Sequence, residues 1–361
     1  MKIGICGHFG ADHDFFDGQT IKTRITAEFL SEKYGVTSII KVDTYGGRKK
    51  VLSHVCGVIN LIKKCQNVII LPAYNGLRIF APLLVLLNKI YHKQLHYIVI
   101  GGWLPKFLTK HRLLKKCLMS FDYIYVETNT MKQNLEKMGF KNVVLLPNYK
   151  KLKKLSNSDL CYDYSKPYRL CILSRITPQK GIRDAVLAVK AVNQKCNEKI
   201  LQLDIYGQID SNYRDSFMKL IEDNKEYVTY GGVVPFEKTV EIIKDYFLLL
   251  FPTKFYTEGI PGTILDAYAA GVPVVSSKWQ SFHDLIVNGK TGLGYDFSDK
   301  NGLFRVLNYA IENPDAIIDM KKKCLEESQK YVPENAMLPL TKRLEICGRK
   351  KENNIFSILP W

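Results

Sequence analysis

The chain has 361 residues, 46% hydrophobic and 24% charged, which is enough apolar material for two globular domains. No apolar run reaches the ~20 residues that span a bilayer, which argues against a membrane-spanning protein. Nine cysteines without C-x-x-C spacing argue against a disulfide or zinc framework, and the start "MKIGICGHFG" predicts a buried strand rather than a signal peptide.

The net charge of +17 is concentrated in the first part of the chain. Residues 1–150 hold 22 Lys and Arg against 9 Asp and Glu, whereas residues 151–361 hold 30 against 26. A basic half beside a nearly neutral half indicates an anionic partner, such as a nucleic acid, a phosphate or a membrane surface. The alternative is that lysines simply keep the chain in solution.

The first half alternates short apolar runs with segments of helical periodicity. Because the runs are almost continuously apolar, they predict buried strands of a parallel sheet that is covered on both faces. The expected strands lie at residues 2–9, 36–43, 67–73, 95–102, 122–128 and 142–148.

Residues 149–167 are polar and basic, which predicts a linker, and the same alternation then restarts. Further strands are expected at residues 168–176, 201–209, 228–234, 246–253, 271–278 and 291–297. The fold class is therefore α/β, with two Rossmann-like doubly wound domains whose carboxyl strand ends face across a ligand-binding cleft. We place the domains at 1–160 and 161–340, followed by a basic tail at 341–361 that is expected to return to the first domain.

The first candidate site is the glycine-containing loop "GHFGADHDFFDGQTIKTR" before the first helix. Gly18 allows close backbone approach, and a helix N-terminus offers free N–H groups to an anion. Lys22 and Arg24 place positive charge where the helix dipole favours acids, so we expect an anion to bind there. The alternative is that both side chains extend into water. The loop lacks G-x-G-x-x-G, which disfavours a dehydrogenase.

The second candidate is the strand-to-helix turn "LSRITPQKG". Arg175 ends the strand and Lys180 precedes the helix. Two cations in one such turn suit a diphosphate, with the guanidinium as a fork and the ammonium as a point charge.

The third candidate is "EGIPGTILD", which begins with Glu258 at the end of a strand. Neither packing nor capping requires an acid at that place. Gly259, Gly262 and Thr263 can present backbone N–H groups to a phosphate. Asp266 follows inside the helix, where the dipole alone could justify an acid. Two acids that bracket an amide-rich turn predict a nucleotide-sugar site.

In order along the chain, these motifs resemble the retaining glycosyltransferases of family 4, which have the GT-B fold. "EGIPGTILD" resembles the family's E-x7-E signature, "LSRITPQKG" its R…KG turn, "LDIYGQ" its V-x-G-x-G strand end, and "VNGKTGLGYDF" its x-N-G-x-T-G turn. "FFDGQTIKTR" resembles the glycine loop under the donor diphosphate, and "LLPNYK" the x-P-N-G strand end. The resemblance covers about residues 1–330; each element alone is weak, whereas their order is specific.

The resemblance implies roles for individual residues. Glu258 would contact the donor sugar, Asp266 the ribose hydroxyls, and Arg175 and Lys180 the diphosphate. The other residues implied on the donor side are Gly18, Gly207, Gly259, Gly262 and Thr263. Those expected on the acceptor or sugar side are Gly101, Gly102, Trp103, Lys22 and Arg24.

Two departures from the family pattern stand out. Asp266 is one methylene shorter than the family's second Glu, so its ribose contact would be shifted or bridged by water. Many members also carry a His within "VxTxHD" after a central strand of the first domain, where this chain has Gly101, Gly102 and Trp103. No catalytic His is therefore transferable, and these glycines would give backbone access to the sugar instead.

Residues 103–119, "WLPKFLTKHRLLKKCLM", carry five Lys and Arg and no acid, interleaved with leucines and aromatics. A basic amphipathic stretch of this kind can lie on an anionic membrane. The alternative is an ordinary surface helix that packs its apolar side on the first sheet.

Together these features imply a metal-independent, retaining glycosyltransferase of the hexosyltransferase type that needs no cofactor. Its donor would be a nucleotide-diphosphate sugar and its acceptor a glycan or polyprenyl-linked oligosaccharide, in capsule or lipopolysaccharide synthesis. We expect it in the cytoplasm, peripheral on the inner face of the membrane. The alternatives are a nucleotide-sugar epimerase or hydrolase of the same fold, or a basic nucleic-acid-binding protein, although no nucleic-acid module is recognisable.

Overall fold

The computed structural model describes residues 1–11, 18–153, 155–162 and 164–355. The chain forms two compact units, one of Met1–Lys151 with Pro333–Trp361 and the other of Leu152–Val332. The sequence placed the boundaries at 160 and 340, about eight residues later in each case. Leu160 belongs to the second unit because its side chain is buried there against Gly271.

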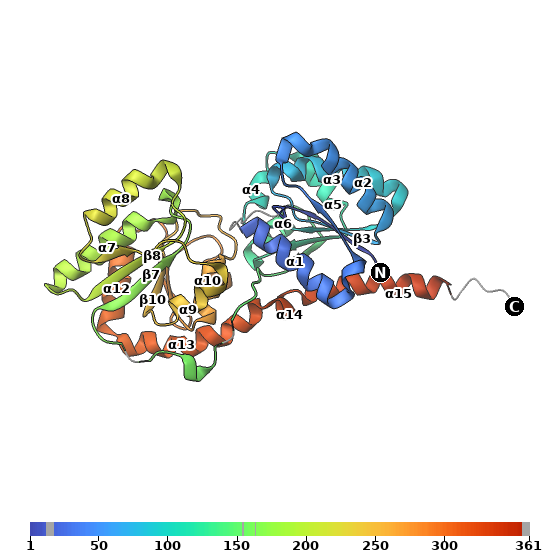
Figure 1. Ribbon diagram of the computed structural model, residues 1–361. Helices are drawn as coiled ribbons and strands as arrows, with labels where there is room; N and C mark the ends of the chain where they lie inside the picture. The colour runs from blue at the N-terminus through green and yellow to red at the C-terminus, as the bar shows by residue number, and fades with distance from the viewer. Residues whose placement is uncertain (12–17, 154, 163, 356–361) are drawn as a thin grey trace. The chain divides into compact units, whose positions relative to one another are not determined.

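Within the described residues, the first unit is built on a parallel sheet of six strands in the order β2-β1-β3-β4-β5-β6. The strands are β1 (Ile3–Gly7), β2 (Ile39–Asp43), β3 (Asn67–Ile70), β4 (Gln94–Ile98), β5 (Tyr123–Val126) and β6 (Val143–Leu145). The helices are α1 (Gly18–Tyr34), α2 (Val51–Lys64), α3 (Tyr74–Tyr91), α4 (Leu104–Leu108), α5 (Arg112–Met119) and α6 (Asn129–Lys137). Figure 1 shows α2, α3 and α5 over one face of this sheet and α1 on the other.

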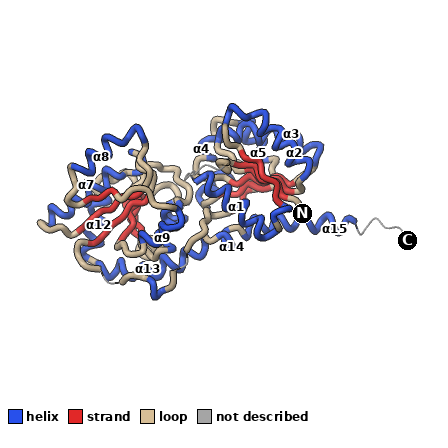
Figure 2. Tube along the Cα trace, in the orientation of Figure 1, coloured by secondary structure: helices blue, strands red, loops and turns tan. Residues whose placement is uncertain are grey.

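The second unit repeats the architecture in the described residues, with six parallel strands in the order β12-β11-β10-β7-β8-β9. The strands are β7 (Tyr168–Leu173), β8 (Leu201–Tyr206), β9 (Val228–Tyr230), β10 (Leu248–Phe251), β11 (Val274–Lys278) and β12 (Gly292–Asp296). The helices are α7 (Ile182–Cys196), α8 (Arg214–Glu222), α9 (Thr239–Ile243), α10 (Gly262–Ala269), α11 (Phe282–Leu285), α12 (Gly302–Glu312) and α13 (Pro314–Ser328). In both units the strands lie at the centre and the helices surround them (Figure 2).

The apolar runs of the sequence become the cores of the two sheets. All four residues of β3 and all four of β10 are buried, as expected for central strands covered on both faces. The edge strand β2 is only half-buried, because a neighbour covers it on one side alone. The sequence therefore predicted the strands and the doubly wound fold class correctly.

The chain returns to the first unit after α13. Helices α14 (Pro333–Ala336) and α15 (Leu338–Ile355) belong to that unit. Tyr34 at the end of α1 donates its hydroxyl to Glu345 at 2.9 Å, and Lys33 forms an ion pair with the same carboxylate at 3.3 Å. The guanidinium of Arg343 lies 5.2 Å from the ring centroid of Tyr123. Residues 356–361 of the expected tail lie outside the described residues.

The order of each sheet reverses between two adjacent strands. In the first unit the chain winds outward in opposite directions from β1 and β3, and in the second unit from β7 and β10. Ligands of doubly wound proteins bind at the carboxyl ends of the strands beside such a reversal. A ligand site is therefore expected at one or both of these places.

Candidate functional site

The two loops beside the strand reversal of the second unit carry the residues that the sequence singled out. The loop after β7 contains Arg175 and Lys180, and the loop after β10 contains Glu258. Because β7 and β10 are hydrogen-bonded neighbours, their carboxyl ends bring these loops together. Residues 78 positions apart in sequence thus meet at one edge of the sheet.

Lys180 and Glu258 form an ion pair in this place, between Nζ and Oε1. Their side chains are 25% and 14% exposed, so the pair is largely shielded from solvent. The hydroxyl of Thr253 donates to the same Oε1 at 3.3 Å, and the Lys180 ammonium lies 5.4 Å from the ring centroid of Phe251. The acid that looked unexplained in the sequence therefore has a cationic partner.

Arg175 supplies a second cation in the same loop. Its side chain is exposed, and it forms no ion pair with any residue that the structure describes. A guanidinium without an internal partner beside a paired lysine can meet an anion without first breaking a contact.

Two glycines of this edge are required by the close approach of backbone. Gly181 has φ +68°, and a Cβ added there would lie 1.8 Å from the carbonyl oxygen of Pro252. Gly207, directly after β8, has φ +138°, and its Cβ would lie 1.8 Å from the carbonyl oxygen of Ser174. A larger residue does not fit at either place, so packing explains both glycines whether or not a ligand binds nearby.

The loop after β10, which contains Glu258 and Gly259, leads into the N-terminus of α10. The helix begins at Gly262 after Pro261, and no side chain among the described residues caps it. The first N–H groups of a helix have no partner within the helix, and the dipole makes that end positive. A Cβ on Gly262 would meet no described atom within 4 Å, and the buried Oγ1 of Thr263 has no hydrogen-bond partner among the described residues. The arrangement is suited to an anion.

The remaining donor-side residues differ in exposure. Gly259 is buried in the loop, and Asp266 is only 2% exposed inside α10. Glu258 is thus the more accessible of the two acids of the signature. The roles predicted for these residues remain predictions.

In the first unit, α1 begins at Gly18, directly after the glycine-containing loop. Lys22 neither extends into water nor stands free for an anion: it is buried and forms an ion pair with Glu127, with 2.7 Å between Nζ and Oε1. Arg24 turns back onto the preceding loop, and its Nε donates to the carbonyl oxygen of Phe9 at 2.7 Å. Asp17 and the phenylalanines before it lie outside the described residues.

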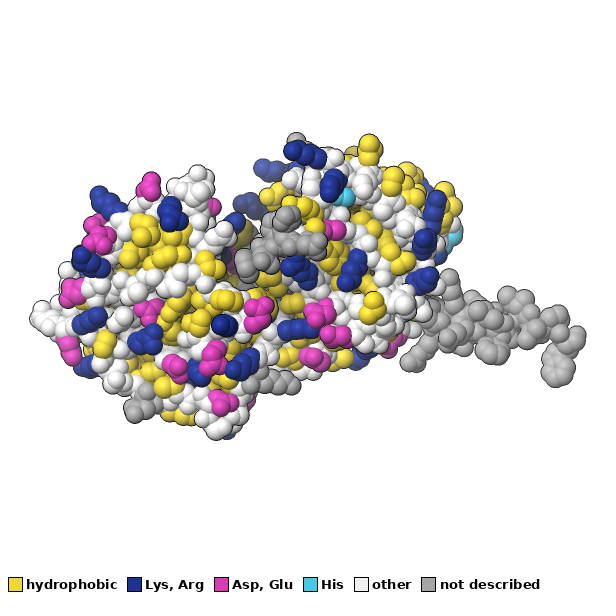
Figure 3. Space-filling model, in the orientation of Figure 1, with side chains coloured by type: hydrophobic (Ala, Val, Ile, Leu, Met, Phe, Trp, Pro, Cys, Tyr) yellow, Lys and Arg dark blue, Asp and Glu magenta, His cyan; other side chains and the backbone are white. Residues whose placement is uncertain are grey.

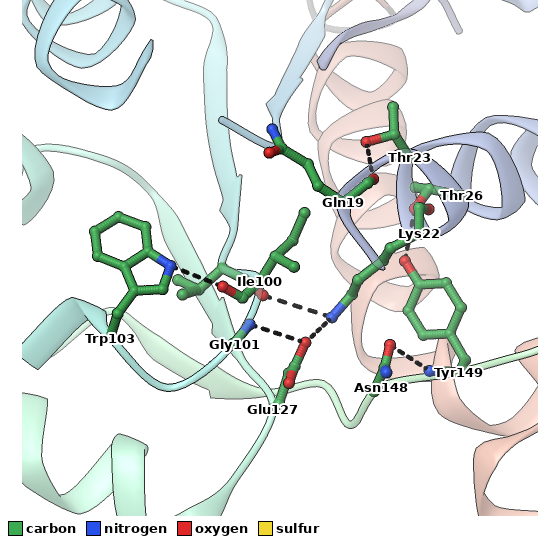
Figure 4. Close-up of polar contacts among 11 residues, drawn as sticks. Gln19, Lys22, Thr23, Thr26, Ile100, Gly101, Trp103, Glu127, Asn148 and Tyr149 are labelled. Atoms are coloured by element: carbon green, nitrogen blue, oxygen red, sulfur yellow. Dashed lines mark hydrogen bonds and ion pairs between the residues drawn. The ribbon is translucent and has the colours of Figure 1, made fainter. Parts of the chain in front are cut away.

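The turn Gly101–Trp103 stands where the resembling family carries a histidine. It follows β4, at the carboxyl edge of the first sheet. Gly101 adopts φ +75°, and its N–H donates to Oε1 of Glu127 at 3.4 Å. The indole N–H of Trp103 donates to the carbonyl oxygen of Ile100 at 2.8 Å. Gly102 lies between them and is partly exposed. Figure 4 shows Lys22, Glu127 and the Gly101 turn converging.

The basic stretch 103–119 forms α4 and α5. Its leucines at 104, 108, 114 and 118 are buried in the first unit, whereas Leu113 is 79% exposed. The ordinary surface-helix interpretation thus accounts for all of these leucines except one. On the face drawn in Figure 3, Lys and Arg side chains are spread over the first unit with apolar side chains between them.

Comparison with known proteins gives a family match within the second unit. Residues 167–313 match the family described as glycosyl transferases group 1. The amylovoran biosynthesis glycosyltransferase AmsK of Erwinia amylovora is 25% identical over 39% of this chain and 35% of its own length. An uncharacterised 41.2 kDa protein in the cps region of Klebsiella pneumoniae is 22% identical over 46% of this chain and 43% of its own. The matches thus span less than half of either relative.

Among solved structures, Anabaena Alr3699/HepE in complex with UDP matches with a TM-score of 0.74. It is 14% identical, and the match covers 96% of this chain and 100% of that one. The chain has the GT-B fold. The sequence prediction of this fold is therefore confirmed.

Three functional candidates on the first sheet of this GT-B chain were missed from the sequence. Asp43, at the end of β2, accepts N–H groups from Phe9 at 2.9 Å and Ala11 at 2.7 Å and so shapes the loop after β1. Burial raises the pKa of this carboxyl, but the backbone N–H groups outweigh burial and hold the pKa below its usual value. The others are Glu127 at the end of β5 and His8, whose Nδ1 lies 2.7 Å from Oγ1 of Thr20. An acid at the carboxyl end of an apolar strand is the signal that could have identified Asp43 and Glu127.

No group of three or more His, Cys, Asp or Glu within the described ranges could hold a metal ion. The triplet Asp12-His13-Asp14 has the D-x-D spacing typical of metal-diphosphate sites, and it lies outside the described residues. Metal independence therefore remains a prediction. None of the described helices is both long and apolar enough to cross a bilayer.

Proposed function

We propose that the chain is a retaining glycosyltransferase of the family 4 type. It would move a hexosyl group from a nucleotide-diphosphate sugar to a glycan or lipid-linked acceptor in surface polysaccharide synthesis. The observation that carries the proposal is the pairing of Lys180 with Glu258 beside the strand reversal, next to the uncapped start of α10. The relatives' names, amylovoran biosynthesis and the cps region, support the polysaccharide context.

In this proposal the second unit binds the donor. Arg175 and Lys180 neutralise the diphosphate, and the N–H groups of Gly262 and Thr263 donate to its oxygens. Glu258 contacts the sugar, and Asp266 contacts the ribose. Lys180 must then be shared between Glu258 and the phosphate, which places the cation beside the bond that breaks.

The reaction needs no residue as nucleophile. The bond between the anomeric carbon and the diphosphate oxygen breaks, and its electron pair remains on the diphosphate. The acceptor hydroxyl forms the new bond from the face that the leaving group departs, and its proton passes to a leaving phosphate oxygen. Stabilising the developing charge on the diphosphate is then the main electrostatic task of Arg175, Lys180 and the helix N-terminus.

A thermal-shift screen of the whole chain tests the proposal. UDP, GDP, ADP and their sugars are added separately, with uridine, guanosine and adenosine as controls, each with and without EDTA. One diphosphate should raise the melting temperature, since a ligand that binds only the folded state stabilises it; a concentration of 100 times Kd adds about 2.7 kcal/mol. UDP is the first choice because HepE binds it. The shift and subsequent turnover should survive EDTA.

The outcomes separate the alternatives. No shift with any diphosphate, together with salt-sensitive binding to duplex DNA, would favour a nucleic-acid-binding protein. A shift followed by release of free sugar without acceptor, or by isomerisation of the donor, would indicate a hydrolase or an epimerase. A shift that EDTA abolishes would overturn metal independence alone.

We also propose that α4 and α5 contact an anionic membrane, because five cations flank the exposed Leu113. The double variant Arg112→Gln/Lys116→Gln should bind phosphatidylglycerol vesicles roughly thirtyfold more weakly in co-sedimentation, since each of the two surface cations contributes about 1 kcal/mol. Arg214→Gln/Lys219→Gln, with the same change of charge on α8, is the matched control. Equal binding by the two double variants would contradict this assignment.

A further inference from the structure

Lys22 and Glu127 form a buried ion pair at the carboxyl edge of the first sheet (Figure 4). Their side chains are 2% and 3% exposed, and they come from α1 and from the residue after β5. Removing two charges from water costs about as much as their attraction returns, so an apolar pair of equal volume is often as stable. Stability is therefore a weak explanation for this pair, and its contacts offer a better one.

The carboxylate is bound at the turn between β4 and α4. Oε1 of Glu127, the oxygen that Lys22 contacts, also accepts the N–H of Gly101 at 3.4 Å. Gly101 has φ +75°, a conformation that side-chain-bearing residues rarely adopt. The indole N–H of Trp103 donates to the carbonyl oxygen of Ile100, the residue before Gly101, at 2.8 Å. Both sides of the turn are thus fixed, one by Glu127 and the other by the turn's own tryptophan.

The ammonium connects this turn to its neighbours. Nζ of Lys22 lies 3.5 Å from the carbonyl oxygen of Val99, just before the turn, and 5.4 Å from the ring centroid of Tyr149. The hydroxyl of Tyr149 lies 2.6 Å from that of Thr26, one turn further along α1. A single cation therefore joins α1 to the chain segments that follow β4, β5 and β6.

We propose that Lys22 and Glu127 are positioning residues that set the conformation of the Gly101–Trp103 turn for the sugar or acceptor. The inference rests on the proposed function, together with the family resemblance that puts the acceptor or sugar side at this turn. Glu127 supplies the acceptor for the Gly101 amide, and Lys22 balances the charge of that carboxylate. A displacement of about 1 Å in a positioning element can cost about 100-fold in rate.

Two double variants isolate the acceptor oxygen. Lys22→Met/Glu127→Met and Lys22→Met/Glu127→Gln both remove the buried charges, and the two replacements at 127 are similar in length and shape. Only the glutamine keeps an oxygen for the Gly101 N–H. Single variants are avoided because an uncompensated buried charge is strongly destabilising.

Both double variants should fold, with melting temperatures close to each other and an unchanged response to the nucleoside diphosphate. The Met/Met variant should lose about 100-fold in kcat with little change in the donor KM, whereas the Met/Gln variant should keep most of its turnover. Equal kcat in the two variants would overturn the inference, because the pair would then be merely structural.

A second measurement does not depend on catalysis. Hydrogen exchange of the Gly101 amide and of the Trp103 indole, followed by NMR, should accelerate in the Met/Met variant and stay slow in the Met/Gln variant. If the wild-type chain neither binds a diphosphate nor turns over, the proposed function fails while this readout still decides whether Glu127 holds the turn. Identical exchange in the two variants would refute the positioning role.

Discussion

Replacing Glu258 by Gln should lower kcat by about 100-fold, because the variant loses a charge aimed at the reacting sugar. The substitution should also make free nucleoside diphosphate bind several-fold more tightly. In the wild type Lys180 is engaged by Glu258, and the glutamine would release its ammonium for the phosphate. Steady-state turnover and calorimetric titration of the same protein would measure the two opposite effects.

Glu241→Gln is the matched control for this experiment. Glu241 is also paired with lysines in the second unit, Lys153 and Lys244, each at 2.6 Å, but its carboxylate is 45% exposed. Its loss should leave both kcat and diphosphate affinity close to those of the wild type. A Glu258→Gln variant that behaves like this control would remove Glu258 from the proposed site.

Gly181→Ala should lower the free energy of unfolding of the second unit by about 3 kcal/mol. The alanine would have to adopt φ +68°, and its Cβ would lie 1.8 Å from the carbonyl oxygen of Pro252. Both the turn after β7 and the end of β10 would have to move, and these two elements hold Lys180 and Glu258. Urea unfolding with probes in each unit would measure the loss.

Gly262→Ala should behave differently from Gly181→Ala, because its methyl group has room. Its Cβ would meet no described atom within 4 Å, so stability should stay within about 0.5 kcal/mol of the wild type. The methyl group would nevertheless stand at the start of α10, where we place the phosphate, and should weaken diphosphate binding about tenfold. Strong binding by this variant would move the phosphate away from α10, and a stable Gly181→Ala protein would contradict the packing argument.

Much of the fold could be predicted from the sequence because its signals are local. Buried parallel strands such as β3 and β10 read as continuous apolar runs, whatever their partners. Helix ends are also local signals: Gly35 follows Tyr34, the last residue of α1, with φ +87°, a conformation that favours glycine at a helix C-terminus. The domain boundaries were harder to predict. They depend on the unit that a segment packs against, as the burial of Leu160 in the second unit shows.

The candidate site was only partly predictable. Lys180 and Glu258 could each be proposed from a turn motif, but their ion pair depends on the adjacency of β7 and β10. Lys22 was expected to meet an external anion because its partner Glu127 is 105 residues away. The charges near a helix N-terminus in the sequence do not show which distant carboxylate, here that of Glu127 after β5, will pack against them.

A donor diphosphate should bind at the carboxyl edge of the second sheet. Calorimetric titration of the diphosphate selected by the screen into the wild type and into Lys180→Met tests it most directly. The Kd of the diphosphate should weaken about tenfold in Lys180→Met, whereas any weak binding of the parent nucleoside should stay the same. The same Kd for the diphosphate in both proteins would contradict it.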